Sequence, residues 1–432
     1  MANIYNSNLT TRYLEPVNHS NTRTEFRLDN NSVYLSNLRL INVGATCDAN
    51  TAVTQMRGTN AIIKSIALYS GNQLLDQVTD MNLWETYTRT LSTNERQTTK
   101  GALNNGSGGL VSVQNDEFEK DEFPMPPSTK LFNRRNQTPN AFPINTTADP
   151  LNTSSWMSVQ GVLSFLSNSV HLPTGIIKDL RLVVLYNGLT EFNKASGANN
   201  VTSVTPIKPL LVADELNPSE TRDAMVRDYQ GVSYTPVEQE RVILPAVAGT
   251  SDSTAPVEQS KTFLLTGFNN KYVEKLICYQ QLTDPSTWDV GGGANLTRTG
   301  AYGCPPQFNP VIQWRVNGQN KYPGIGLQGH NRALAMLVDH VGDSSFVPGG
   351  NTIGVVGNAN VYDTSLGELP YHNGYTCMPI ELDISELQLT FGRDGVSNDP
   401  ATKGELFINI FGIVRKQLAL RNNGQGFVIS YV

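Results

Sequence analysis

The sequence predicts an all-β protein of two consecutive β-sandwiches, with a few helices in its loops and long inserted loops. Short apolar runs are separated throughout by Asn, Thr, Ser, Gly and Pro, which is typical of strands joined by turns. The regular alternation of strands and helices that marks a parallel sheet is absent. The 432 residues suffice for two domains, and the two halves of the chain repeat one pattern.

Several of the apolar runs alternate apolar and polar residues, so that one face of each strand can be buried. Leu180 and Leu182 fall on one face of their run, and Leu387 and Leu389 do the same in another. This alternation is typical of antiparallel sheets with one face in a core. The candidate strands span residues 24–28, 32–43, 61–69, 176–186, 240–247, 262–268, 272–282, 310–316, 380–391, 405–420 and 426–432.

Helices and loops are predicted from the segments between these runs. Loops as long as the polar ones here are usually specialised when they lie in a compact domain. We therefore expect a sandwich that displays its loops. The candidate helices span 80–91, 156–168 and 328–341, and the long polar loops span 92–109, 115–130 and 187–209.

The repeated pattern is clearest at two places in each half. A strand ends in a turn at Gly71 in the first half, and another ends in a turn at Gly318 in the second half; a candidate helix follows each. Residues 176–188 and 383–395 both place alternating leucines before a turn that ends in glycine. The sequence thus predicts a duplicated architecture with little sequence identity between the halves.

Three glycines match the spacing of a dinucleotide-binding fingerprint, Gly324-x-Gly326-x-x-Gly329. That fingerprint needs a strand running directly into the glycines and an acidic residue at the end of the next strand. Here Pro323 comes directly before Gly324, and the region where the acidic residue should lie reads as a turn. We interpret the glycines as a bend between a strand and a loop helix.

No catalytic, cofactor-binding or metal-binding residue is assigned. The four cysteines and five histidines lack the spacing of a metal module, and no nucleophile motif occurs. Trp288 lies in a loop and is the tryptophan best placed for a surface contact, whereas Trp84, Trp156 and Trp314 fit core patterns. An acidic stretch reads as a solvated loop, although cation binding between subunits stays open; it contains Asp116, Glu117, Glu119, Asp121 and Glu122.

The charge pattern argues against strong binding to nucleic acid. The formal net charge is −6, and the first 30 residues carry only Arg12, Arg23 and Arg27 as basic side chains. A protein that neutralises packaged nucleic acid usually has a basic arm. The chain also lacks the apolar run of about 20 residues that a membrane-spanning helix needs. Its N-terminal residues do not match a signal peptide.

The sequence resembles the double jelly-roll major capsid proteins of tailless icosahedral double-stranded DNA viruses, the lineage of polinton-like viruses, virophages and the adenovirus hexon. The likeness is closest in residues 156–188, where Leu172-Pro173 and Gly175 precede a strand with Leu180 and Leu182. In that family a short helical segment, a Leu-Pro pair and such a strand close the first jelly roll. Residues 273–282 resemble an early strand of the second roll.

The resemblance implies two eight-stranded jelly rolls, spanning residues 1–220 and 221–432. It implies a homotrimer shaped as a pseudo-hexameric capsomer, strands roughly perpendicular to the shell, and loops that form towers and clasp neighbours. The implied partners are other copies of the chain, penton proteins and minor or cement capsid proteins, with no cofactor and no enzymatic activity. We expect the apolar segment 424–432 to pair within the second roll or under a neighbouring subunit.

Two other functions remain open from the sequence. A β-sandwich that binds or cleaves glycans would display aromatic side chains near Trp288. A minor or vertex capsid protein would share the fold class but form a pentamer or contain a single jelly roll.

Overall fold

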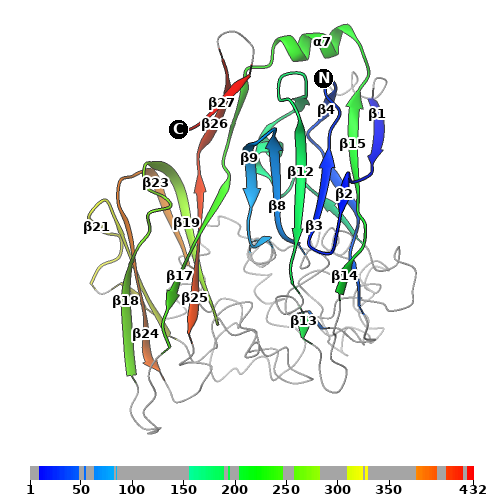
Figure 1. The fold of residues 1–432 in the computed structure, drawn as a ribbon. Coiled ribbons are helices and arrows are strands. Elements are labelled where there is room, and N and C mark those ends of the chain that lie inside the picture. The colour runs from blue at the N-terminus through cyan, green and yellow to red at the C-terminus, as the bar shows by residue number, and fades with distance from the viewer. Residues whose placement is uncertain are drawn as a thin grey trace, which may run out of the picture.

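The structure is a computed structural model, and it describes residues 9–47, 53–54, 63–81, 84, 155–188, 193–194, 204–246, 257–282, 309–324, 326–328, 376–396, 405–421 and 426–432. These residues form two β-sandwiches that stand side by side (Figure 1). The predicted all-β class is confirmed.

The first sandwich is made by strands that precede residue 217. The strands are β1 (Leu9–Leu14), β2 (Asn18–His19), β3 (Arg23–Arg27), β4 (Val33–Leu35), β5 (Arg39–Val43), β8 (Ile63–Ser70), β9 (Gln73–Val78), β10 (Ser155–Ser158), β11 (His171–Pro173), β12 (Leu180–Tyr186) and β15 (Leu210–Leu216). One sheet has the order β10-β5-β15-β4-β11, and β1 also pairs with β15. The other sheet has the order β2-β3-β12-β8-β9.

The second sandwich is made by later strands. They are β17 (Val237–Leu244), β18 (Val257–Leu264), β19 (Lys271–Leu282), β20 (Asn309–Val316), β21 (Gln319–Asn320), β22 (Leu327–Gln328), β23 (Thr376–Ile384), β24 (Leu387–Val396) and β25 (Leu406–Val414). One sheet has the order β17-β25-β19-β23, and the other has the order β18-β24-β20-β21, with β22 also paired to β20.

The two sandwiches share one strand order, which confirms the predicted duplication. The path β1-β15-β5-β10 in the first corresponds to β17-β25-β19-β23 in the second, and β3-β12-β8-β9 corresponds to β18-β24-β20-β21. The turns singled out in the sequence occupy equivalent hairpins, with Gly71 at φ +56° and Gly318 at φ +81°. Glycine adopts this left-handed conformation without a steric penalty, which explains its presence at both turns.

A third sheet and helix α7 (Glu220–Arg227) connect the sandwiches. The sheet has the order β16 (Gly231–Tyr234), β26 (Lys416–Leu420), β27 (Phe427–Tyr431). Helix α7 leads from β15 towards β16 and lies across one end of the strands (Figure 1). Helix α5 (Ser164–Asn168) lies in the first sandwich. Short pairings also join β6 (Ala45–Cys47) to β14 (Val204–Pro206) and β7 (Val53–Thr54) to β13 (Asn193–Lys194).

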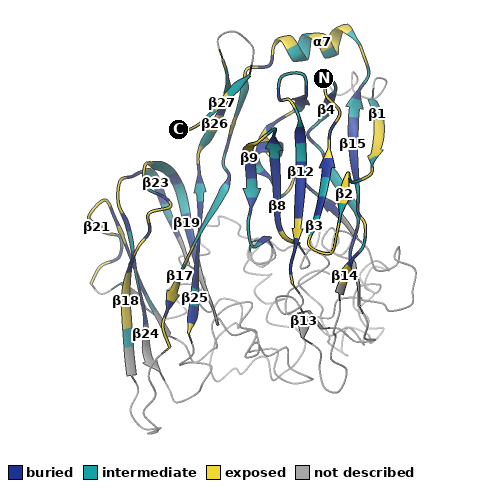
Figure 2. Ribbon diagram, viewed as in Figure 1, coloured by how far each residue is buried: buried dark blue, intermediate teal, exposed yellow. Residues whose placement is uncertain are grey.

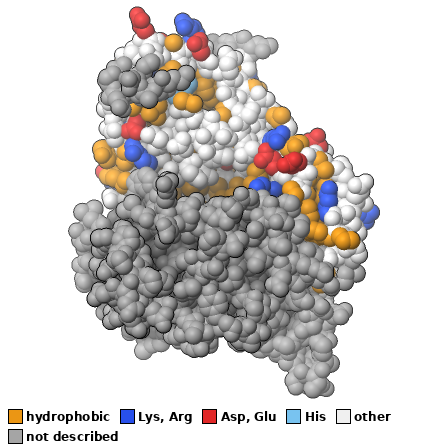
Figure 3. All heavy atoms as spheres, turned by 180° about the vertical axis from the view of Figure 1, so that it is seen from behind, with side chains coloured by type: hydrophobic (Ala, Val, Ile, Leu, Met, Phe, Trp, Pro, Cys, Tyr) orange, Lys and Arg blue, Asp and Glu red, His pale blue; other side chains and the backbone are white. Residues whose placement is uncertain are grey.

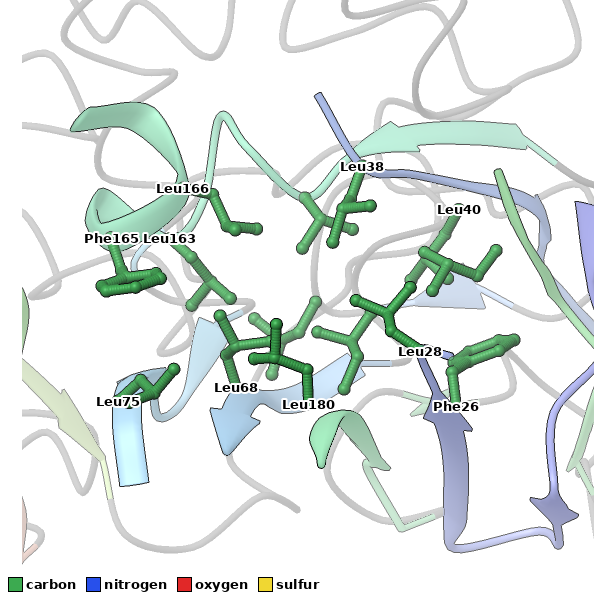
Figure 4. Close-up of a cluster of buried hydrophobic side chains, with 14 of the residues drawn as sticks. Phe26, Leu28, Leu38, Leu40, Leu68, Leu75, Leu163, Phe165, Leu166 and Leu180 are labelled. Carbon is green, nitrogen blue, oxygen red and sulfur yellow. The ribbon is translucent and has the colours of Figure 1, made fainter. Parts of the chain in front are cut away.

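Each sandwich encloses its own apolar core, drawn as dark blue ribbon in Figure 2. In the first core the inward residues Leu68, Leu180 and Leu182 are fully buried, whereas Leu185 on the opposite face of β12 is exposed. Figure 4 shows Leu68 and Leu180 meeting Leu163 and neighbouring apolar side chains across the sandwich. Burying one such side chain contributes about 1.5–3 kcal/mol before entropy is counted.

One predicted helix was partly wrong. Residues 155–158 form β10, and the helix covers only residues 164–168 of the predicted 156–168. Strand β10 pairs with β5, and this pairing along the sheet edge overrides the helix-like spacing of the apolar residues. Gln328, the first residue of the predicted helix 328–341, belongs to strand β22, and the rest of that helix lies outside the described residues. Most of the helix 80–91 and the loop 92–109 also lie outside them.

Candidate assembly interface

The outer face of one second-sandwich sheet carries a row of polar and aromatic side chains. Paired residues of an antiparallel sheet lie on the same face. Gln239 is paired with Phe411 and Arg241 with Asn409, and their face is opposite to the one that Ile408 and Ile410 present to the core. We call Gln239, Arg241, Phe407, Asn409 and Phe411 the second-roll outer face.

The second-roll outer face is bonded to the end of β9 in the first sandwich. Thr79 Oγ1 donates a hydrogen bond to Gln239 Oε1 at 2.8 Å, and Gln239 Nε2 donates to Asp80 Oδ2 at 2.7 Å. Arg241 forms an ion pair with Asp80 and donates from Nε to the buried Asn409 Oδ1 at 2.7 Å. These contacts join the two sandwiches directly.

An aromatic contact lies beside this polar network. The ring of Trp84 is 5.4 Å from the ring of Phe411. Trp84 packs against both apolar cores, and Phe411 is fully buried. The prediction that Trp84 serves core packing is therefore confirmed, and the core it serves is the junction of the sandwiches.

The third sheet also fastens the second half of the chain to the first core. Tyr234 in β16 donates from its hydroxyl to the carbonyl of Leu75 at 2.6 Å, and its ring meets Phe165 edge-on at 5.2 Å. Leu418 in β26 is fully buried in the same core, and Phe427 packs against it. The predicted strand in 426–432 is confirmed, because β27 pairs with β26.

Helix α5 is held in place for this contact by a buried carboxylate. Asp76 accepts hydrogen bonds from the Phe165 backbone N–H at 2.8 Å and the Ser164 hydroxyl at 3.0 Å. Burial raises the pKa of Asp76 above its ordinary value, and the hydrogen bonds offset part of that rise. Asp76 therefore positions Phe165 against Tyr234.

A charged cluster ties β27 to the second sandwich. Glu238 accepts hydrogen bonds from Lys271 at 2.5 Å, from Lys416 at 2.8 Å and from the Tyr431 hydroxyl at 2.8 Å. Burial opposes ionisation of Glu238, but these donors outweigh it and hold its pKa below the ordinary value. Both lysine ammonium groups also lie 4.7 Å from the ring centre of Tyr431.

On the outer face of the corresponding sheet in the first sandwich, residues of β1 are exposed, whereas those of β15 are buried. Thr11 is paired with Asp214, and Tyr13 with Val212, on the face opposite to the core residues Leu211 and Ala213. We call Thr11, Tyr13, Arg39, Val212 and Asp214 the first-roll outer face. Asp214 accepts hydrogen bonds from Thr11 at 2.7 Å and Arg39 at 2.9 Å. The Tyr13 side chain is 65% exposed.

The glycine motif lies in a bend, as the sequence predicted. Gln313 on β20 donates from Nε2 to the carbonyl of Tyr322 at 2.8 Å and accepts from the Tyr322 N–H at 3.0 Å, which fixes the bend to the strand. Gly326 has φ +126°, and a Cβ there would lie 2.6 Å from the Ile312 carbonyl. The glycines Gly324 and Gly326 thus serve backbone conformation and close packing, whereas Gly329 lies outside the described residues.

Of the other residues singled out in the sequence, Trp314 and Trp156 lie in described parts of the chain. Trp314 is fully buried in the second core, which confirms its predicted role. Trp156 lies in strand β10 rather than in the helix predicted for it. Trp288 and the acidic stretch 116–122 fall outside the described residues, so the predictions for them remain predictions.

Neither a metal cluster nor a membrane span emerges from the parts of the chain described here. No group of three or more His, Cys, Asp or Glu side chains among them is placed to hold a metal ion. No helix in those parts has the length and apolar character to cross a bilayer. Seen from behind, the surface carries acidic and basic side chains in small mixed groups (Figure 3).

Comparison with solved structures identifies the fold. The structure of PBCV-1 VP54 fitted into a reconstruction of the virophage Sputnik matches with a TM-score of 0.57 and 10% identity over 98% of this chain and 97% of the other. The mavirus major capsid protein matches with a TM-score of 0.53 and 8% identity over 98% and 90% of the two chains. The cryo-EM structure of the Sputnik virophage gives 0.52 and 10% over 98% and 88%.

These likenesses show that the chain has the double jelly-roll fold. They confirm the predicted fold class and, at the level of fold, the resemblance drawn from the sequence. No protein-family model and no curated protein sequence matches the chain.

Proposed function

We propose that the chain is a structural major capsid protein that trimerises into pseudo-hexameric capsomers, which tile an icosahedral virus shell. The observation that supports this most is the pair of sandwiches with one strand order, held in one body by the second-roll outer face. Three such chains present six similar units around one axis, and a six-sided block tiles a shell. The fold shared with capsid proteins of virophages points the same way.

The division of the chain belongs to this proposal. We place the first jelly roll in residues 1–220 and the second in 221–432. Strands up to β15 pair only among themselves in the described residues, as do strands from β16 onward, and α7 begins at Glu220 between the two sets. Tyr234 and Leu418 nevertheless complete the first core, so the first roll depends on the second for burial.

The proposal extends to partners and location. The chain would bind other copies of itself, penton proteins and minor or cement capsid proteins, and would reside in the virion. It would need no cofactor and would perform no catalytic step. We also propose that it does not bind nucleic acid strongly, in keeping with its net charge of −6.

Sedimentation velocity combined with electron microscopy of the purified chain tests the proposal. The expected particle has three times the 47.3 kDa mass of one chain and a hexagonal outline. A stable monomer at all concentrations would contradict the capsomer, and a pentamer would indicate a vertex protein instead.

A further inference from the structure

We propose that His171 is a pH-sensitive latch, which holds helix α7 against the first jelly roll while its ring is neutral and releases the helix when the ring is protonated. The latch belongs to a single chain and does not depend on the assembly proposed above. It consists of the imidazole of His171, in β11, and the end of α7 that the ring contacts.

Helix α7 is the covalent link between the two rolls. It follows β15 of the first roll and leads to β16, whose Tyr234 enters the first core. At its N-terminus the Ser219 side chain accepts a hydrogen bond from the Arg222 N–H at 3.1 Å. None of its residues is fully buried, and Figure 2 shows them as exposed or intermediate. The position of α7 therefore relies on a small number of specific contacts.

His171 supplies one of these contacts at the other end of the helix. Its Nε2 lies 3.1 Å from the carbonyl oxygen of Met225. The last carbonyl groups of a helix lack partners within the helix. The Tyr229 N–H, which would reach Met225 in a continuing helix, donates instead to the Val226 carbonyl at 3.4 Å. His171 thus satisfies a carbonyl that the end of the helix leaves free.

The contacts of the two ring nitrogens suit a neutral imidazole. A carbonyl oxygen can only accept a hydrogen bond, so Nε2 carries the proton of the neutral ring. Nδ1 then bears a lone pair, and it is buried without a hydrogen-bond partner in the described residues. The ring of Tyr229 packs edge-on against His171, with the ring centres 5.6 Å apart, and its own buried hydroxyl does not bond to Nδ1.

Protonation places a second N–H at the buried Nδ1, where the described residues offer no acceptor. A buried donor without a partner is costly, and a buried charge more so. The C-terminal end of a helix favours a nearby cation, which acts in the opposite direction. Burial outweighs this effect, because it lowers the pKa of His171 below the ordinary 6.5, and the Met225 carbonyl offsets only part of that change.

The charged groups around the ring do not compensate for its burial. Arg227 and Asp228 form an ion pair with each other at the exposed end of α7. Strand β4 places the apolar Leu35 opposite His171. None of the charged side chains of α7 and its end is among the groups that move the His171 pKa; they are Glu220, Arg222, Asp223, Arg227 and Asp228.

The direction of the response follows from proton linkage. A released ring has the ordinary pKa of 6.5 and binds a proton more readily than the latched ring. The contribution of the latch is therefore complete above about pH 6.5 and is lost as the pH falls from there through the folded pKa. Mild acid should loosen α7 and, with it, the link between the two rolls.

Hydrogen exchange of the full chain tests the latch, measured between about pH 7.5 and about pH 5 and corrected for the intrinsic exchange rate. We expect the protection of the α7 amides to fall by at least about threefold in the wild type. His171→Gln retains a side-chain donor for Met225 but does not titrate, so its α7 protection should not depend on pH. His19→Gln is the matched control, since His19 is also partly buried with a lowered pKa, and it should behave as wild type.

Unchanged α7 protection over this pH interval overturns the inference, as does a loss that persists in His171→Gln. Nuclear magnetic resonance of wild-type chain with isotopically labelled histidine gives a readout that needs no folded variant. The His171 ring should titrate below pH 6.5 together with shifts in the α7 amides. A midpoint at or above 6.5, or titration without any response of α7, overturns the inference and leaves the proposed function untouched.

Discussion

Leu28 and Leu180 are joined by a backbone hydrogen bond, in which the Leu28 N–H donates to the Leu180 carbonyl at 3.0 Å. The second roll repeats this bond between Leu265 and Leu387 at 2.9 Å. Leu28 follows β3 and Leu265 follows β18, which are equivalent strands. The duplication therefore extends from strand order to single backbone hydrogen bonds.

Gly412 should tolerate no side chain. A Cβ at this position would lie 2.2 Å from the ring of Phe268. Gly412→Ala is expected to lower the free energy of unfolding by about 1–3 kcal/mol, because the ring and strand must shift. Denaturant unfolding measures this, with Gly161→Ala as the control, since a Cβ there meets nothing closer than 3.6 Å. Equal stability of the two variants would contradict the packing described.

The hydroxyl of Tyr234 should contribute measurably to the attachment of β16 to the first roll. Tyr234→Phe leaves the buried Leu75 carbonyl without its donor, which costs about 1–3 kcal/mol. Tyr13→Phe removes a hydroxyl from an exposed side chain and should change stability by less than about 0.5 kcal/mol. Thermal and denaturant unfolding of both variants measure the difference. An unchanged free energy of unfolding for Tyr234→Phe would contradict the prediction.

Asp76 should make stability depend on pH in an unusual direction for a carboxylate. Its pKa is raised in the folded chain by burial, so the folded state binds a proton more readily than the unfolded state. The contribution of Asp76 is therefore greatest at low pH and is lost as the pH rises from about the ordinary value of 3.8 through the raised folded value. The stability of wild type relative to Asp76→Asn should fall over that interval. A flat difference would contradict the prediction.

Glu238 should show the opposite dependence. Its folded pKa is lowered, so its contribution is present above the ordinary value of 4.5 and is lost as the pH falls through the folded value. Glu238→Gln removes the charge that faces Lys271 and Lys416, and should lower stability at pH 7 by about 1–3 kcal/mol. Hydrogen exchange should accelerate in β27. Glu220→Gln, on an exposed residue of α7, is the control, and equal exchange in the two variants would refute the role of Glu238.

Much of the fold could be predicted from periodicity alone. The strands around Leu180, Leu389 and Trp314 alternate clearly, since one face of each enters a core. The run 405–420 was predicted as one strand but is two, β25 and β26, because the chain leaves one sheet and enters another. The same occurs at 380–391, which contains the end of β23 and the start of β24.

Other elements were missed for physical reasons. Strand β1 is partly exposed, so its residues need no apolar alternation. Strand β15 is buried on both faces and carries Asp214 and Glu215, which interrupt the pattern. Helix α7 did have a signal, since Ser219 caps it and Glu220 opens its first turn.

The junction between the rolls could not be predicted. Asp80 meets Gln239 and Arg241 across a separation of about 160 residues, which local patterns do not encode. Only the three-dimensional arrangement brings the end of β9 onto β17 and β25.

The insertion of Leu418 into the first core sets an order for folding during synthesis. The ribosome completes strands β1 to β15 long before it reaches residue 418, so the first roll emerges with a gap in its apolar interior. Domains generally fold as units as they leave the ribosome, and exposed apolar surface at that stage invites aggregation or chaperone binding. A chain that stops early would keep that gap open. Only a chain that includes these late strands therefore completes the apolar core of the first roll.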